Sequence, residues 1–226
     1  MTDILVLVHT VARLVGEFDQ LCDKLLPNVR VLHIVDEPIA ERIRQHGSTT
    51  AEDAERLAEH AELAEDIGAD AVLVTCSTLS PCVDTIRDRF RMPVVTIDHA
   101  TVVEALRLGT RIAVVATAAT ALEASRNLLL AEARRAGKPV DISLRLEDVA
   151  GLALLSGDET THDRLVERAV REEAERSDVV VLAQASMARA LTAIAGRSVP
   201  VPVLSGPVLA LHEVRAILLK EKSAQT

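Results

Sequence analysis

The sequence of 226 residues contains almost no aromatic side chains: it has two phenylalanines, no tryptophan and no tyrosine. This composition excludes functions that depend on stacking of bases or sugars, or on an aromatic cage around a cation. Positive charge is also scarce, because 25 lysines and arginines face 34 acidic residues, for a net charge of −9. A nucleic-acid surface needs a clustered basic field, so we expect no nucleic-acid partner.

Long hydrophobic runs are missing too. The N-terminus has only a short apolar run, Ile4–Val8, without a basic segment before it, and no apolar stretch approaches the ~18 residues of a membrane helix. The three cysteines form no C-x-x-C pair and have no histidine-rich cluster near them. We therefore expect no disulfide framework, no metal site and no membrane partner, in a cytoplasmic protein with reduced thiols.

The motifs of common cofactor sites are absent as well. No G-x-G-x-x-G follows a predicted strand, and neither a Walker A motif nor the G-x-S-x-G elbow of α/β-hydrolases occurs. We therefore expect no cofactor, and chemistry performed by side chains alone.

Short β-branched apolar runs alternate with long amphipathic segments, which predicts an α/β fold with parallel sheets. Thr49-x-x-Glu52 has the spacing of a capping box, and Gly68 fits the position just past a helix end. Ser80 before Pro81 predicts a helix start with Ser80 as its N-cap. The expected strands are Ile4–Val8, Val29–Val35, Ala71–Thr75, Val94–Ile97, Arg111–Ala116, Val140–Leu146, Val179–Leu182 and Val201–Leu204.

The chain repeats itself at a nearly constant interval. Asp70–Thr78 resembles Asp178–Ser186, and Ile4–His9 resembles Ile112–Thr117, in both cases 108 positions later. Matches in the same order at one offset indicate that one strand–helix arrangement occurs twice.

The repeat predicts two pseudo-symmetric Rossmann-like (flavodoxin-like) lobes, each with a parallel four-stranded sheet, and a cleft between them. We expect residues 1–98 plus 207–226 to form the first α/β lobe and residues 99–206 to form the second.

Ligands of open parallel sheets bind beyond the carboxyl ends of the strands. Small hydroxyl side chains recur there, each before a predicted helix whose free N–H groups favour an anion. The hydroxyls and the free N–H groups together suit binding of a small carboxylate or phosphate. Serine and threonine at such junctions are, however, also ordinary helix caps. The candidate site residues are Cys76 as the catalytic residue, and His9, Thr10, Ser77, Thr78, Thr117, Thr120, Gln184 and Ser186 as substrate-binding residues.

Cys76 is the strongest of these candidates for a catalytic role, because it ends an apolar run and precedes a predicted helix start. A thiol at a helix N-terminus can have a lowered pKa and act as a base, acid or nucleophile; a buried structural cysteine is the alternative. Cys22 and Cys82 are expected to be core residues. His9 either orients a substrate or hydrogen-bonds a neighbour, and His162 is expected to cap a helix, lie exposed or contribute to function.

These residues resemble the aspartate/glutamate/hydantoin racemase superfamily over essentially the whole chain. The segments that carry the resemblance are Val6–Thr10, Leu73–Leu79, Arg111–Thr117, Gly157–Asp163 and Val181–Met187. In that family two cysteines, one from each lobe, work on opposite faces of an acidic carbon. The resemblance places Cys76 in the first position and Gln184 in the second, and the repeat pairs the same two positions. An amide cannot act as the opposing acid or base near neutral pH.

The resemblance implies a cofactor-independent racemase or isomerase that acts on a small polar carboxylic acid, with single-cysteine proton transfer by Cys76. A decarboxylase or another lyase of the superfamily is an alternative, since relatives such as arylmalonate decarboxylase use one cysteine, although that enzyme keeps it in the other lobe. A non-catalytic carboxylate-binding protein is a further alternative. Relatives are often dimers or larger, which implies a homo-oligomer.

Overall fold

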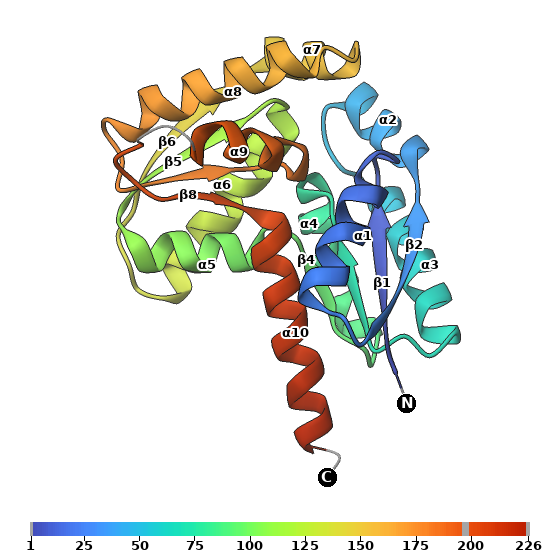
Figure 1. The fold of residues 1–226 in the computed structure, drawn as a ribbon. Helices are drawn as coiled ribbons and strands as arrows, with labels where there is room; N and C mark the ends of the chain where they lie inside the picture. The colour runs from blue at the N-terminus through green and yellow to red at the C-terminus, as the bar shows by residue number, and fades with distance from the viewer. Residues whose placement is uncertain (1, 196–198, 225–226) are drawn as a thin grey trace. The chain divides into compact units, whose positions relative to one another are not determined.

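The apolar runs of the sequence form two four-stranded, all-parallel sheets in the computed structural model (Figure 1), which describes residues 2–195 and 199–224. The strand orders are β2-β1-β3-β4 and β6-β5-β7-β8, so the same winding occurs twice. The expected α/β fold with parallel four-stranded sheets is confirmed. No helix among the described residues is long and apolar enough to cross a membrane.

The chain divides into two compact units, Met1–Ile97 with Pro207–Thr226, and Asp98–Gly206. The first unit holds β1 (Asp3–His9), α1 (Leu14–Leu25), β2 (Val29–Val35), α2 (Glu37–His46), α3 (Ala51–Asp66), β3 (Ala71–Val74), the 3₁₀ helix η1 (Ser77–Leu79), α4 (Ser80–Ile86), the 3₁₀ helix η2 (Arg87–Arg89), β4 (Val94–Thr96) and most of α10 (Gly206–Ala224). The second unit holds α5 (His99–Leu108), β5 (Arg111–Ala116), α6 (Ala119–Arg135), β6 (Asp141–Leu146), α7 (Asp148–Leu155), α8 (Glu159–Ala174), β7 (Val179–Leu182), the 3₁₀ helix η3 (Ala185–Arg189), α9 (Ala190–Ala195) and β8 (Val203–Ser205).

Helices cover the faces of each sheet, and this burial explains why most strands read as unbroken apolar runs. In the first unit, α2, α3 and α4 pack on the face that carries Val6, Val8, Val72 and Val74. In the second unit, α7, α8 and α9 pack on one face of the sheet, while α5 and α6 pack on the other.

The repeat extends to side chains that fix the starts of strands. Asp70, which precedes β3, accepts the backbone N–H of Ile4 at 2.7 Å. Asp178, which precedes β7, accepts the N–H groups of Thr110 and Arg111 at 3.0 and 2.9 Å. Each aspartate ties the entrance of the first strand of its unit to the entrance of the third, so the two matched aspartates have one structural role.

Two of the predicted helix starts are wrong by one or more residues. The capping box of α3 is formed by Thr50 and Asp53, whose side chains each accept the other's backbone N–H, and not by Thr49 and Glu52. The hydroxyl of Thr49 instead hydrogen-bonds the thiol of Cys82. Ser80 does not cap a helix, because it lies inside α4 directly after η1. Paired threonines and paired acidic residues allow two registers of the capping motif, and tertiary contacts select one.

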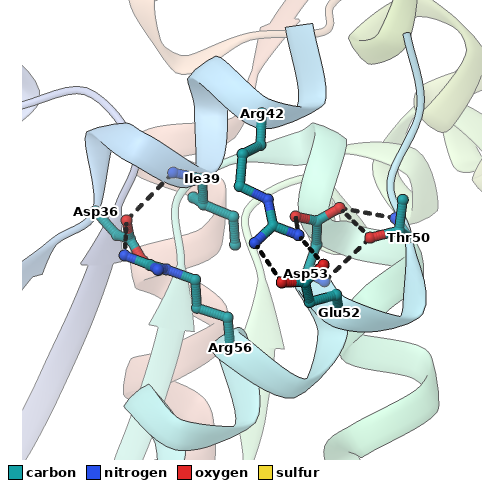
Figure 2. A network of polar contacts seen from close by, with 7 residues as sticks. All are labelled: Asp36, Ile39, Arg42, Thr50, Glu52, Asp53 and Arg56. Atoms are coloured by element: carbon teal, nitrogen blue, oxygen red, sulfur yellow. Dashed lines mark hydrogen bonds and ion pairs between the residues drawn. The ribbon is translucent and has the colours of Figure 1, made fainter. Parts of the chain in front are cut away.

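A network of charges fastens α2 to α3 in the first unit (Figure 2). Asp36, directly after β2, caps α2 by accepting the N–H of Ile39 and also binds the guanidinium of Arg56 on α3. His60 lies 2.7 Å from the same carboxylate. At the next turns, Arg42 of α2 pairs with Glu52 and with the fully buried Asp53. Burial alone would raise the pKa of Asp36, but its hydrogen bonds with Arg56, His60 and Ile39 lower the pKa to about 2.

Asp36 is therefore expected to make folding sensitive to acid. Its folded-state pKa is depressed, so its stabilisation is present above the unfolded pKa near 4 and is lost as the pH falls through about 2. The contribution at neutral pH is about 2 kcal/mol. Urea unfolding at pH 7 and pH 3 should show a smaller loss of stability in Asp36→Asn than in the wild type. Asp66→Asn, an exposed neutralisation on α3, should behave like the wild type, and equal losses in all three proteins would contradict this role.

Candidate functional site

The candidate residues lie at the carboxyl ends of the first and third strands of each unit, as the sequence predicted. His9 is the last residue of β1 and Thr10 follows it, while Cys76 comes two residues after β3. In the second unit, Thr117 follows β5 and Gln184 comes two residues after β7. The two units thus place their candidates at equivalent points of equivalent sheets.

The thiol of Cys76 is surrounded by hydrogen-bond donors of its own unit. Cys76 is the N-cap residue of η1, and the backbone N–H of Leu79 donates to its carbonyl oxygen at 3.0 Å. The N–H groups of Thr78 and Leu79 also act to lower the pKa of the thiol. The hydroxyls of Thr10 and Thr78 also hydrogen-bond the sulfur. Donors arranged in this way stabilise a thiolate relative to a thiol.

Burial nevertheless outweighs these donors and raises the pKa of Cys76. The expectation of a lowered pKa is therefore wrong. The 3₁₀ helix that starts here has only three residues, and α4 follows it directly from Ser80. At neutral pH the thiol is therefore mainly protonated, and a larger fraction becomes thiolate as the pH rises.

The other two cysteines are buried core residues, as predicted. Burial, together with Asp19 and Asp23, raises the pKa of Cys22 to about 12. Burial also raises the pKa of Cys82, and the hydrogen bond with Thr49 opposes this shift.

His9 is fully buried, and both of its ring nitrogens are engaged within the first unit. Nδ1 lies 2.9 Å from the hydroxyl of Thr75, and Nε2 lies 2.9 Å from Nδ1 of His33. Burial and the neighbouring His33 lower the pKa of His9 to about 4, against a raising effect of Asp19. Two roles were considered for His9, orienting a substrate and hydrogen-bonding a neighbour. The structure shows the second.

Gln184 is bound by donors of its own unit. Its side-chain oxygen accepts the N–H of Thr117 at 2.6 Å, the N–H of Ala118 at 3.2 Å and the hydroxyl of Thr117 at 3.0 Å. Backbone N–H groups can only donate, so these bonds fix the amide with its oxygen toward the loop after β5 and its nitrogen away from it. The donors at Thr117 that we expected to hold a carboxylate are therefore occupied by Gln184 itself.

We expect Gln184→Ala to uncover an anion-binding nest at Thr117 and Ala118. Two N–H groups would lose their acceptor, which destabilises by about 2 kcal/mol in total where water does not replace it. Acetate can accept from both, so it should raise the melting temperature of the variant more than that of the wild type. Ser186→Ala, a truncation two positions away, should show no added response. An equal acetate effect in all three proteins would contradict the proposed nest.

The remaining candidates have different surroundings. Ser77 is buried, whereas Thr78, Thr120 and Ser186 are half-buried, and binding roles for these four residues stay predictions. His162 neither caps a helix nor lies exposed: Asp158 caps α8, and the His162 side chain is fully buried with Nδ1 2.8 Å from Asp163. The polar sequence of the first turn of α8 did not show that His162 is buried while Glu159 and Thr160 are exposed.

Several residues of the site escaped the sequence analysis. Thr75 was placed at the end of a strand but was not among the candidate site residues, yet its hydroxyl reaches the carbonyl of Val8 and the ring of His9. Ala118 acts through its backbone N–H, which leaves no trace in the side chain. Gly151 of α7 lies against the same loop, since a Cβ there would be 2.6 Å from the carbonyl oxygen of Thr117. Of these three residues, only Thr75 could have been identified from the sequence, because it lies next to Cys76.

Three solved structures with the same fold are distant from this chain in sequence. Glutamate racemase from Thermus thermophilus matches with a TM-score of 0.73 at 16% identity, over 98% of this chain and 82% of its own. Allantoin racemase from Klebsiella pneumoniae matches with a TM-score of 0.71 at 20% identity, over 97% and 89% of the two chains. Arylmalonate decarboxylase matches with a TM-score of 0.62 at 17% identity, over 95% and 92%. At these identities the structures establish a shared fold.

Sequence comparison settles the family. Among curated proteins no sequence match is found. The family model for Asp/Glu/hydantoin racemases, by contrast, matches residues 5–214, which include every candidate residue of both units. The resemblance seen in the sequence is confirmed: the chain belongs to the Asp/Glu/hydantoin racemase family.

Proposed function

We propose that the protein is a cofactor-independent enzyme that transfers a proton at the carbon next to the carboxylate of a small polar carboxylic acid. Cys76 is the reacting group. The observation that carries this proposal is the surroundings of a thiol just after β3, where polar groups of Thr10, Thr78 and Leu79 all act to lower its pKa. Membership of a racemase family supports the reaction class.

Each protonation state of Cys76 has a defined role in this chemistry. The thiolate removes the α-proton, and the electron pair moves into the carboxylate to give an enediolate. The thiol returns a proton to the same carbon. If the S–H first exchanges its proton with solvent, return by the thiol introduces a solvent hydrogen with retention. Return by water to the opposite face inverts the carbon, as an isomerase or racemase requires, and the thiol then gives its proton to the hydroxide that is left.

Gln184 stands where the family resemblance places a second cysteine, and its amide neither gains nor loses a proton near neutral pH. Its oxygen is held by Thr117 and Ala118, so the amide N–H groups are what it offers to a substrate oxygen. We assign Gln184 a binding role, with proton transfer left to the thiol.

Decarboxylation is the second candidate function, and the raised pKa of Cys76 favours it. Loss of CO₂ from an activated acid leaves the same enediolate without any base, and a protonated thiol then completes the reaction. Arylmalonate decarboxylase shares the fold, which supports this candidate. The scarcity of aromatic residues makes an aryl substrate a poor fit, so a small polar diacid is preferred.

Incubation in D₂O with amino acids, hydantoins, malonates and sugar acids tests the proposal. Deuterium should enter the α-position of at least one compound, and CO₂ release separates decarboxylation from isomerisation. A turned-over compound should also protect Cys76 from iodoacetamide. Cys76→Ala should exchange no deuterium, and equal exchange in this variant would exclude Cys76. Binding of a carboxylate without exchange or CO₂ release would identify a non-catalytic binding protein instead.

A further inference from the structure

A row of four polar side chains runs through the first unit from the end of β3 to the surface. It comprises Thr75, His9, His33 and Asp19. His33 lies on β2, and its Nε2 is 3.0 Å from the carboxylate of Asp19 on α1. The two imidazole rings are nearly parallel, with 15° between their planes, and the edge of Phe18 packs on His9. Only the Asp19 end is well exposed, at 55% of its side chain.

The donors and acceptors of this row can be counted. A neutral imidazole has one N–H and one bare nitrogen, an imidazolium has two N–H groups, and a hydroxyl has a single hydrogen to donate. The hydroxyl of Thr75 has two acceptors within reach, the carbonyl of Val8 at 3.1 Å and Nδ1 of His9 at 2.9 Å. It can donate to only one of them at a time. This choice allows two complete arrangements of hydrogens.

In the first arrangement His33 is protonated. Both of its nitrogens donate, one to Asp19 and the other to Nε2 of His9. His9 then carries its hydrogen on Nδ1 and donates to the oxygen of Thr75. The hydroxyl of Thr75 in turn donates to the carbonyl of Val8.

In the second arrangement His33 is neutral. Its one hydrogen must lie on Nε2, because a bare nitrogen 3.0 Å from the carboxylate of Asp19 would be repelled. Nδ1 of His33 then accepts from Nε2 of His9, and Nδ1 of His9 accepts from the hydroxyl of Thr75. The two arrangements differ by one proton, and every bond between Thr75 and His33 is reversed.

We propose that His33 exchanges this proton with solvent while His9 stays neutral, and that the reversal makes His33 a positioning residue for the end of β3. The low pKa of His9 agrees with a ring that changes tautomer when His33 loses its proton but stays uncharged. When His33 gains or loses its proton, the hydroxyl of Thr75 therefore changes its acceptor between the carbonyl of Val8 and Nδ1 of His9.

Other ionisable groups of the first unit surround the row. On α1 they are Asp19, which faces His33, with Cys22 and Asp23 nearby. Asp36 at the end of β2 donates its backbone N–H to the carbonyl of His9, and Arg56 and His60 bind its carboxylate. Since Asp36 is already paired and Cys22 stays protonated, Asp19 is the group that decides which nitrogen of His33 carries hydrogen.

The consequence for Cys76 rests on the proposed function. Thr75 precedes Cys76 in the chain, and Thr10, which follows His9, hydrogen-bonds the sulfur. The reversal turns the hydroxyl of Thr75, the residue before Cys76, between the carbonyl of Val8 and the ring of His9. The rate of Cys76 alkylation against pH should therefore depart from a single titration curve at the pH where the row reverses.

Histidine side-chain ¹⁵N–¹H spectra over about pH 5 to 8 test the reversal directly. His9 should change from the Nδ1–H to the Nε2–H tautomer as His33 loses its proton, and should show no imidazolium signal. A His9 tautomer that stays constant over this range, or a His9 that itself becomes charged, would overturn the proposal. This readout needs no substrate, so it is independent of the catalytic role of Cys76.

Asp19→Asn supplies the decisive variant. An asparagine amide can donate to a bare Nε2 of His33, so neutral His33 can keep its hydrogen on Nδ1 and His9 need not change tautomer. The reversal and the departure in the alkylation profile should both disappear. Asp23→Asn, the same change on the same helix, should retain both. Reversal that persists in Asp19→Asn, or an alkylation profile identical to that of the wild type, would contradict the positioning role.

Discussion

Serine in place of Cys76 is expected to lower deuterium exchange into the substrate by about 10³-fold. General acid–base groups contribute rate factors of this order, and a serine hydroxyl does not ionise near neutral pH. The serine oxygen can keep the hydrogen bonds with Thr10, Thr78 and Leu79, so stability should change by less than about 1 kcal/mol. Exchange measured by proton NMR, alongside urea unfolding, separates the two effects.

Cys82→Ser is the matched control, because Cys82 is another thiol of the same unit that also hydrogen-bonds a threonine, although it is more deeply buried than Cys76. Its exchange rate should equal that of the wild type. Equal loss of exchange in both variants would mean that thiol removal acts through the fold. Equal rates in Cys76→Ser and the wild type would remove Cys76 from the reaction.

The pH profile then distinguishes the two candidate reactions. Burial raises the pKa of Cys76, so the thiolate becomes more abundant as the pH rises above neutrality. Proton abstraction, which needs the thiolate, should become faster over this range. Decarboxylation that ends with protonation by the thiol should be level near neutral pH and become slower in alkaline solution.

The strands and the repeat could be predicted because they depend on local features of the sequence. Val72–Val74 is apolar at every position, as strands buried on both faces require, and Asp70 and Asp178 precede equivalent strands for the same backbone reason. The positions of Cys76 and Gln184 at strand ends follow from the same pattern.

The properties of these two side chains could not be predicted. The sign of the pKa shift at Cys76 depends on a competition between burial and four hydrogen bonds, and the sequence indicated only the donors. The bonds of Gln184 depend on a loop 67 residues earlier in the chain, at Thr117. Such long-range distances are set by the packing of the whole unit, so the sequence predicted that the candidates lie at strand ends but not their electrostatics.

Gly109 is expected to be among the least replaceable residues of the second unit. Its backbone is extended, with φ of −167°, so its conformation suits any residue. A Cβ at this position, however, would lie 2.3 Å from the Cβ of Asp178 and 2.9 Å from its carboxylate. Asp178 cannot withdraw freely, because its carboxylate binds the N–H groups of Thr110 and Arg111 and the Arg111 guanidinium.

Gly109→Ala should therefore destabilise the protein by about 3 kcal/mol, since either the β5 entrance or Asp178 has to move and its hydrogen bonds are lost. Gly16→Ala is the matched control. Gly16 lies within α1 with no atom within 4 Å of its Cβ position, so alanine there should stabilise by about 1 kcal/mol. Urea unfolding of both variants gives the comparison. A Gly109→Ala protein as stable as the wild type would show that Asp178 can leave Thr110 and Arg111 at little cost, against the role assigned to the repeated aspartates.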